Sequence, residues 1–225
     1  MPETVAVIDF ETTGLSPSTG GRATEIAAVR VRDGRVVDHY ASLMRSDAWV
    51  SPFIERLTGI SNEMLADAPP AAQVMREVAA FVGDSPLVAH NAAFDRAFWR
   101  AELRRAGEDA DQPFACTLLL GRRLYPSSPD HRLGTLAAWH GLAAAGPAHR
   151  ALADAQTAAM LWLQIQRDVR QRFGLASAPH ELLSSMQRSS RDTLARCVAL
   201  HHDAAGAEGA AKPAGPRQRT ATSLP

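Results

Sequence analysis

The stretch AVIDFETTGL, residues 6–15, constrains the fold more than any other part of the sequence. Its continuous apolar run predicts a buried strand at Thr4–Phe10, yet the stretch goes on to place two acids, Asp9 and Glu11, at the strand's end. Because residues i and i+2 of a strand point to the same face, about 6.6 Å apart, both carboxylates can face one site. Solvated strand ends also carry acids. If the pair is buried, a shared proton, a basic partner or a divalent cation has to offset its charge.

Other segments predict a mixed α/β fold in a single domain. The Asp33-Gly34 dipeptide is typical of a hairpin turn and joins strands expected at Ala23–Arg32 and Arg35–Met44. A short apolar strand is expected at Pro86–Ala89. Helical spacing predicts helices at Pro70–Val82, Ala92–Ala106, Leu118–Tyr125, Leu133–His140, Ala151–Phe173 and His180–Leu200. Strands that are followed by strands mixed with helices indicate a mixed sheet with helices packed on it.

The chain of 225 residues is long enough for one sizeable core and too short for two full domains. We expect a main domain at residues 1–175, a helical extension at residues 176–202 and a disordered tail at residues 203–225. The extension fits packing on the domain better than a surface for a partner, although both are open to a helix with one apolar face. The tail is rich in Ala, Gly and Pro and poor in large apolar residues.

Composition excludes several classes of protein. The net charge of zero argues against a protein that coats nucleic acid through bulk positive potential. Cys116 and Cys197 lack the spacing of a zinc site or a disulfide framework. No run approaches the roughly 18 apolar residues of a membrane span, and a strand-like segment follows Met1 almost directly, so we expect a soluble, cytoplasmic protein.

Two further segments place acids near polar turns. LVAHNAAFDRAFW, residues 87–99, has Asp95 in the first turn of a helix, where an acid is favourable in any case. AHRALADAQTAAMLW, residues 148–162, has His149 five residues before Asp154. Five helical residues rotate by about 140°, so both side chains can face one site only if His149 lies in the loop before the helix. A solvated loop histidine is the alternative.

In combination, these segments resemble the DEDDh 3′–5′ exonucleases, most closely the proofreading type found as the epsilon subunit of bacterial DNA polymerase III. DFETTG, HNAAFD and HRALADA are similar to the three motifs of that family, and the last has its His-to-Asp spacing of five. LTGIS, residues 57–61, resembles a loop that wedges against the terminal bases, and CTLLLGRRLYP, residues 116–126, resembles the helix after the second motif. The resemblance covers about residues 4–167 and implies an RNase H-like mixed sheet flanked by helices.

The resemblance also implies roles for single residues. Four carboxylates would bind two divalent cations, Mg²⁺ or Mn²⁺, and His149 would act as the general base; the four are Asp9, Glu11, Asp95 and Asp154. Two cations about 3.5–4 Å apart suit phosphodiester hydrolysis because they activate water and neutralise the charge that develops. The expected substrate-binding residues are Thr12, Thr13, Gly14, Leu15, Thr58, Gly59, His90, Asn91 and Phe94, of which Phe94 also fits a core position.

The activity implied is hydrolysis from the 3′ end of single-stranded DNA, which releases nucleoside 5′-monophosphates, in proofreading or repair. Two alternatives stay open: an exonuclease that trims RNA, and a silent module that binds nucleic acid or a polymerase. The presence of all five site residues argues against the silent module. Because we find no Gln-Leu-x-Leu-Phe-like stretch, and because the last 23 residues lack apolar anchors, we expect a free-standing or loosely associated enzyme.

Overall fold

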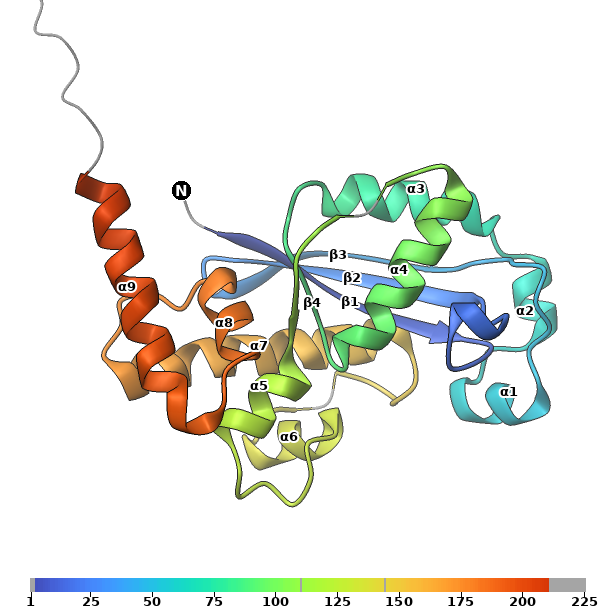
Figure 1. Ribbon diagram of the computed structural model, residues 1–225. Coiled ribbons are helices and arrows are strands. Elements are labelled where there is room, and N and C mark those ends of the chain that lie inside the picture. The colour runs from blue at the N-terminus through green and yellow to red at the C-terminus, as the bar shows by residue number, and fades with distance from the viewer. Residues whose placement is uncertain (1–2, 110, 144, 211–225) are drawn as a thin grey trace, which may run out of the picture.

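A five-stranded mixed sheet forms the centre of the computed structural model, which describes residues 3–109, 111–143 and 145–210 (Figure 1). The strands are β1 (Thr4–Thr12), β2 (Ala23–Arg32), β3 (Arg35–Leu43), β4 (Leu87–Ala89) and β5 (Phe114–Cys116), in the order β3-β2-β1-β4-β5. The pairs β1–β2 and β2–β3 are antiparallel, whereas β1–β4 and β4–β5 are parallel. The predicted mixed α/β fold is therefore confirmed.

The turn between β2 and β3 is the hairpin that the sequence predicts. Asp33 and Gly34 both have positive φ, 53° and 74°. A two-residue turn of this kind matches the twist of the flanking strands and favours Asp-Gly, because glycine tolerates the left-handed region. Arg32 and Arg35 pair directly across it, which sets the register of the β2–β3 ladder.

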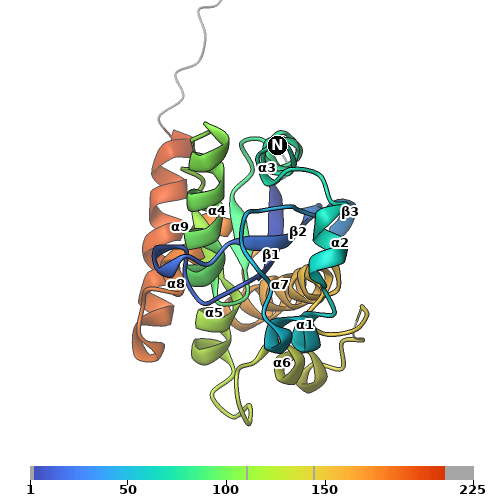
Figure 2. The same ribbon diagram turned by 90° about the vertical axis from the view of Figure 1, so that its right-hand side faces the viewer.

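Helices cover both faces of the sheet (Figures 1 and 2). The long helix α7 (Ala151–Phe173) packs on one face, and α3 (Ala71–Val82) and α4 (Ala92–Ala106) pack on the other. Residues of β1 alternate between these two cores: Val5 and Val7 contact the α7 side, while Ile8 and Phe10 contact the other side. Burial on both faces explains why β1 reads as a continuous apolar run rather than an alternating one.

Two short helices that the sequence analysis did not predict lie between β3 and α3. They are α1 (Pro52–Thr58) and α2 (Asn62–Ala66). Each is too short to show helical periodicity, but each has a serine cap: Ser51 accepts the Ile54 N–H, and Ser61 accepts the Met64 N–H. The segment LTGIS, expected as a loop, is thus the end of α1, a left-handed Gly59 and the cap of α2.

The remaining helices are α5 (Thr117–Leu124), α6 (Leu133–Trp139), α8 (His180–Met186) and α9 (Leu194–Ala210), and single turns of 3-10 helix lie at Pro17–Thr19 and Arg191–Thr193. The helix expected over His180–Leu200 is interrupted between α8 and α9. Its packing on the domain is confirmed, because Leu182, Leu183 and Met186 join the core that α7 forms with the sheet. Among the residues described, none of the helices combines the length and apolarity that a membrane crossing requires.

Helix α8 also covers the edge of the sheet. The side-chain amide of Gln187 accepts the Cys116 N–H at 2.6 Å and donates to the Phe114 carbonyl at 3.0 Å. The backbone of the edge strand β5 is therefore paired rather than open. Helix α9 continues past residue 202, where the tail was expected to begin, because its alanine-rich sequence has a high helix propensity. The rest of the expected tail, residues 211–225, lies outside the described residues.

Candidate active site

Strand β1 delivers two acids to its carboxyl end. Asp9 and Glu11 share the face that packs against α7, and Glu11 lies directly opposite Glu25 of β2. The register shifts between Glu11 and Thr12. Such an irregularity bends a strand and disrupts its pairing locally, directly after Glu11.

A third acid reaches this point from helix α4. The helix begins after Asn91, which has a left-handed φ of 69°, and Asp95 lies in its first turn, only 2% exposed. The backbone N–H of Phe10 donates a hydrogen bond to the Asp95 carboxylate. The start of α4 is thereby tied to the end of β1, beside Asp9.

A fourth acid and a histidine come from the start of α7. His149 lies in the loop before the helix, after the Gly146-Pro147 break, and has a left-handed φ of 61°. Its backbone N–H donates to Oδ2 of Asp154 at 2.9 Å. The potential ligand atoms of Glu11, His149 and Asp154 all lie within 4.8 Å of one another. The fold thus brings Glu11 of β1 next to His149 and Asp154, which lie more than a hundred positions later in the sequence.

The acids raise one another's pKa. Burial is the largest cause for Asp9, whose pKa lies well above its ordinary value, and the charges of Asp95, Glu11 and Asp154 add to it. Burial and neighbouring carboxylates also raise the pKa of Glu11 to about 8. The pKa of Asp95 rises to about 8 despite its backbone hydrogen bonds, and burial raises that of Asp154. Clustered carboxylate oxygens with excess negative charge are a donor set that suits hard divalent cations such as Mg²⁺ and Mn²⁺.

Apart from those at the end of β1 and in the loop after it, three of the residues expected at the substrate have side chains engaged inside the protein. The His90 imidazole contacts Thr117 Oγ1 at 2.9 Å and the His131 carbonyl at 3.0 Å, and burial lowers its pKa to about 4. Thr58 is buried and donates to the Ile54 carbonyl. Phe94 packs on Phe98, with 4.9 Å between ring centroids, so it takes the core position that the sequence left open.

The end of β1 and the loop after it contain four other expected substrate residues, Thr12 to Leu15. The Thr12 hydroxyl donates to the Gly14 carbonyl at 2.8 Å, and the Thr13 hydroxyl accepts the Arg22 N–H at 3.0 Å. These bonds fix the loop from inside. Leu15, in contrast, is 90% exposed. This exposed apolar side chain is available to contact a base or sugar, as the sequence resemblance implies for Leu15.

A cleft of about 1000 Å³ opens next to the acids. Its walls include Asn91, Arg122 and Arg132 as well as His149 and Asp154. Guanidinium groups in such a position suit phosphate oxygens. The cleft therefore places His149 and Asp154 beside arginines that can bind the phosphates of a nucleic acid.

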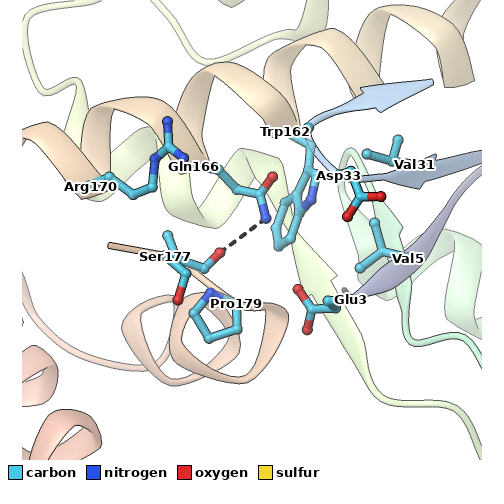
Figure 3. A pocket seen from close by; sticks show the side chains of 11 residues that line it. Glu3, Val5, Val31, Asp33, Trp162, Gln166, Arg170, Ser177 and Pro179 are labelled. Carbon is cyan, nitrogen blue, oxygen red and sulfur yellow. Dashed lines mark hydrogen bonds between the residues drawn. The ribbon is translucent and has the colours of Figure 1, made fainter. Parts of the chain in front are cut away.

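A second cavity, of about 410 Å³, lies at the other end of β1 (Figure 3). It is lined by Glu3 and Val5 at the start of the strand, Asp33 at the hairpin and Trp162 of α7. Since a strand rises about 3.3 Å per residue, roughly 20 Å of strand separates Glu3 from Asp9. This cavity is separate from the acid cluster.

One charged pair at the site, Glu25 and Arg150, was not predicted from the sequence. Glu25 is buried, with Nε and Nη2 of Arg150 at 3.2 Å and 2.9 Å from its carboxylate oxygens. The signal in the sequence is an acid inside the apolar run ATEIAAV, directly before Ile26. Its partner could not be read from the sequence because it lies more than a hundred positions away.

Comparisons with known proteins agree with these motifs. The family model described as an exonuclease, RNase T, matches residues 6–162. The chain is 38% identical over 172 residues to the PolC-type DNA polymerase III of Bacillus subtilis strain 168, which covers 76% of this chain and 12% of that protein. It is 33% identical over 186 residues to the 3′-5′ exonuclease DinG of the same organism, covering 82% of this chain and 19% of that protein. The chain thus spans a small part of these relatives.

Solved structures share the fold. Exonuclease X in complex with 5′ overhanging duplex DNA superposes with a TM-score of 0.62 at 30% identity, covering 77% of this chain and 95% of that one. A zinc-bound complex of Escherichia coli exonuclease I with single-stranded DNA gives a TM-score of 0.64 at 20% identity, covering 76% of this chain and 41% of that one. The expected RNase H-like architecture is confirmed. The chain belongs to the RNase T exonuclease family, which confirms its predicted resemblance to the DEDDh 3′–5′ exonucleases.

Proposed function

We propose that this chain removes nucleotides one at a time from the 3′ end of single-stranded DNA and releases nucleoside 5′-monophosphates. The observation that supports this activity best is the convergence of four carboxylates and His149 at the end of β1. Their raised pKa values indicate a site that favours positive charge. Hydrolysis of a phosphodiester requires that charge, because negative charge develops on the oxygens around phosphorus.

Asp9, Glu11, Asp95 and Asp154 would hold two divalent cations, Mg²⁺ or Mn²⁺. When bound, the cations would supply an activated water and neutralise the developing charge. Two of the four carboxylates are held in advance by backbone N–H groups: Phe10 binds Asp95, and His149 binds Asp154. Groups fixed before the reaction need no reorganisation during it.

His149 would accept the proton of the attacking water. Its backbone is held by the bond to Asp154, while the residue itself is exposed in the loop, so the ring can reach a water and return the proton to solvent. Leu15 and Asn91, both exposed, would contact the 3′-terminal nucleotide, together with the backbone of Thr12, Thr13 and Gly14. Gly59 would approach it from the end of α1. Thr58, His90 and Phe94 would support these contacts from inside.

The cleft with Arg122 and Arg132 would receive the rest of the strand through its phosphates. Such contacts do not depend on base sequence, as an enzyme that shortens any strand requires. The relative bound to 5′ overhanging duplex DNA suggests that a recessed 3′ end is a second substrate to test. We further propose a role in proofreading or repair in the cytoplasm, with no more than loose association with a polymerase, although PolC-type relatives carry a similar domain.

The test is a time course on 5′-labelled oligonucleotides with Mg²⁺, with and without a chelator. Single-stranded DNA, recessed duplex DNA and RNA of the same sequence are compared, with Asp9→Ala as the inactive control. The proposal expects a metal-dependent ladder that shortens from the 3′ end and is absent from the control. Faster decay of RNA would favour the RNA-trimming alternative, and silence on all substrates with both Mg²⁺ and Mn²⁺ would favour a binding module.

A further inference from the structure

Glu25 uses both of its carboxylate oxygens to hold the start of α7. Oε1 accepts Nη2 of Arg150 at 2.9 Å, and Oε2 accepts Nε of Arg150 at 3.2 Å and the backbone N–H of Ala151 at 3.0 Å. Glu25 is only 5% exposed, and these partners offset the cost of burying its carboxylate. A two-point contact between a guanidinium and a carboxylate fixes orientation as well as position.

The position of Glu25 suggests a different role, which its contacts argue against. It stands directly across from Glu11 on the same face of the sheet, so it could be taken for a fifth cation ligand. Both of its oxygens, however, already accept hydrogen bonds from Arg150 and from the first residue of α7. Glu25 thus anchors the helix rather than facing the open side of the acid cluster.

The residue between these anchors and the acids is His149, and its backbone is strained. A φ of 61° costs free energy for any residue other than glycine, although histidine adopts it more often than most residues, so it persists where the surroundings support it. The residues just before it, Ala145–Ala148, are exposed. The restraints lie on the other side: the His149 N–H is bound to Asp154, and the next two residues are bound to Glu25.

We infer that Glu25 and Arg150 form a clamp that holds His149 in its left-handed conformation and so aims its imidazole at the acid cluster. Both are positioning residues that act through His149. The inference rests on the proposed function, in which His149 takes the proton of the attacking water. A side chain moved by about 1 Å can reduce turnover about 100-fold, so the clamp should matter for kcat.

The test compares steady-state kinetics of Arg150→Met and Glu25→Gln with those of the wild type. We expect kcat to fall about 10- to 100-fold, while KM for the oligonucleotide and the half-saturating Mg²⁺ concentration change less than about twofold. Arg150→Lys, which keeps the charge but loses the fork, should recover only part of the rate. A loss of metal affinity in Glu25→Gln would make Glu25 a cation ligand and overturn the inference.

Double variants separate positioning from general stability. In a His149→Ala background, Arg150→Met should cause no further loss of kcat, because the group that the clamp aims is gone. A loss that multiplies in that background, or a wild-type kcat in Arg150→Met, would overturn the inference. A matched control is Tyr125→Phe, which removes another hydrogen bond to a carboxylate of α7, where Tyr125 donates to Oδ2 of Asp168 at 2.7 Å. It should lower stability and leave kcat unchanged.

A readout without turnover covers the case in which the wild type itself is inactive on nucleic acid. Amide hydrogen exchange at His149 should speed up at least tenfold in Arg150→Met and Glu25→Gln, while exchange in the middle of α7 stays unchanged. Unchanged exchange at His149 would show that the clamp does not hold this backbone, whatever the substrate is. A silent wild type with faster exchange would reject the proposed function alone.

Discussion

Asp9 and Asp95 come from different layers of the fold, and the charge of Asp95 is, after burial, the largest influence that raises the pKa of Asp9. The strand supplies one carboxylate and the helix on the other face of the sheet supplies its neighbour. Folding therefore brings together groups that repel. A site of this kind lowers the stability of the protein in exchange for chemistry.

Replacing one of these acids should stabilise the metal-free protein. We expect Asp9→Asn to raise the free energy of unfolding by about 1 kcal/mol, or Tm by about 2–4 °C, while it abolishes activity. Calorimetry at pH 8 in a chelator measures the shift. Asp84→Asn, at an exposed acid, is the control and should leave Tm unchanged. A lower Tm in Asp9→Asn would show that the carboxylates do not repel.

The stability of the metal-free protein should also depend on the pH through Glu11. Its pKa is raised from 4.5 to about 8 in the folded state, so between these values the folded chain binds more protons than the unfolded chain. The free energy of unfolding contributed by Glu11 is therefore complete below about pH 4.5 and is lost as the pH rises toward 8. Glu11→Gln does not titrate. Its advantage in urea unfolding should grow from pH 5 to pH 8, and a constant difference would refute this.

Leu15 should contribute to substrate binding and not to folding. Because the side chain is 90% exposed, Leu15→Ala removes almost no buried area, and Tm should stay within about 1 °C of the wild type. We expect KM for single-stranded DNA to rise about tenfold, which corresponds to about 1.4 kcal/mol. Steady-state assays on short oligonucleotides measure this. An unchanged KM would remove Leu15 from the binding site.

Gln187 should stabilise the edge of the sheet without taking part in the reaction. Gln187→Ala leaves the buried N–H of Cys116 without its bond, which costs about 1–3 kcal/mol. Chemical denaturation measures the loss, and kcat should not change. Gln187→Glu keeps an acceptor for Cys116 but places a buried carboxylate oxygen beside the Phe114 carbonyl, so its stability should also fall below that of the wild type. Full stability in the alanine variant would mean that α8 covers the edge without this contact.

Long, strongly patterned segments could be predicted from the sequence. The strand at Ala23–Arg32 and the helices at Ala92–Ala106 and Ala151–Phe173 have the expected bounds. Each combines a periodic apolar pattern with a clear start or stop signal, such as Asn91 and Gly107 around α4. The convergence of Asp9, Glu11, Asp95, His149 and Asp154 was likewise expected, because their motifs resemble those of a known family; the roles assigned to them stay predictions.

Features that depend on distant contacts could not be predicted. Helix α1 and strand β5 are too short for periodicity, and β5 pairs only through neighbours far along the chain. The break between α8 and α9 follows Gln187, whose side chain bonds the edge strand instead of facing solvent. The Glu25–Arg150 clamp joins a strand to the start of a helix that lies 125 positions later in the sequence. Local sequence patterns contain no record of such pairings.

The most direct test of the account is the number of cations that the acid cluster binds. Calorimetric titration with Mn²⁺ should give two ions per chain for the wild type and for His149→Ala, and weaker binding of fewer ions for Asp9→Asn. The histidine variant separates cation binding from proton transfer. Fewer and more weakly bound ions on removal of the Asp9 carboxylate would confirm that β1 carries these acids to bind cations. Equal binding by the wild type and Asp9→Asn, or no binding by either, would contradict the account.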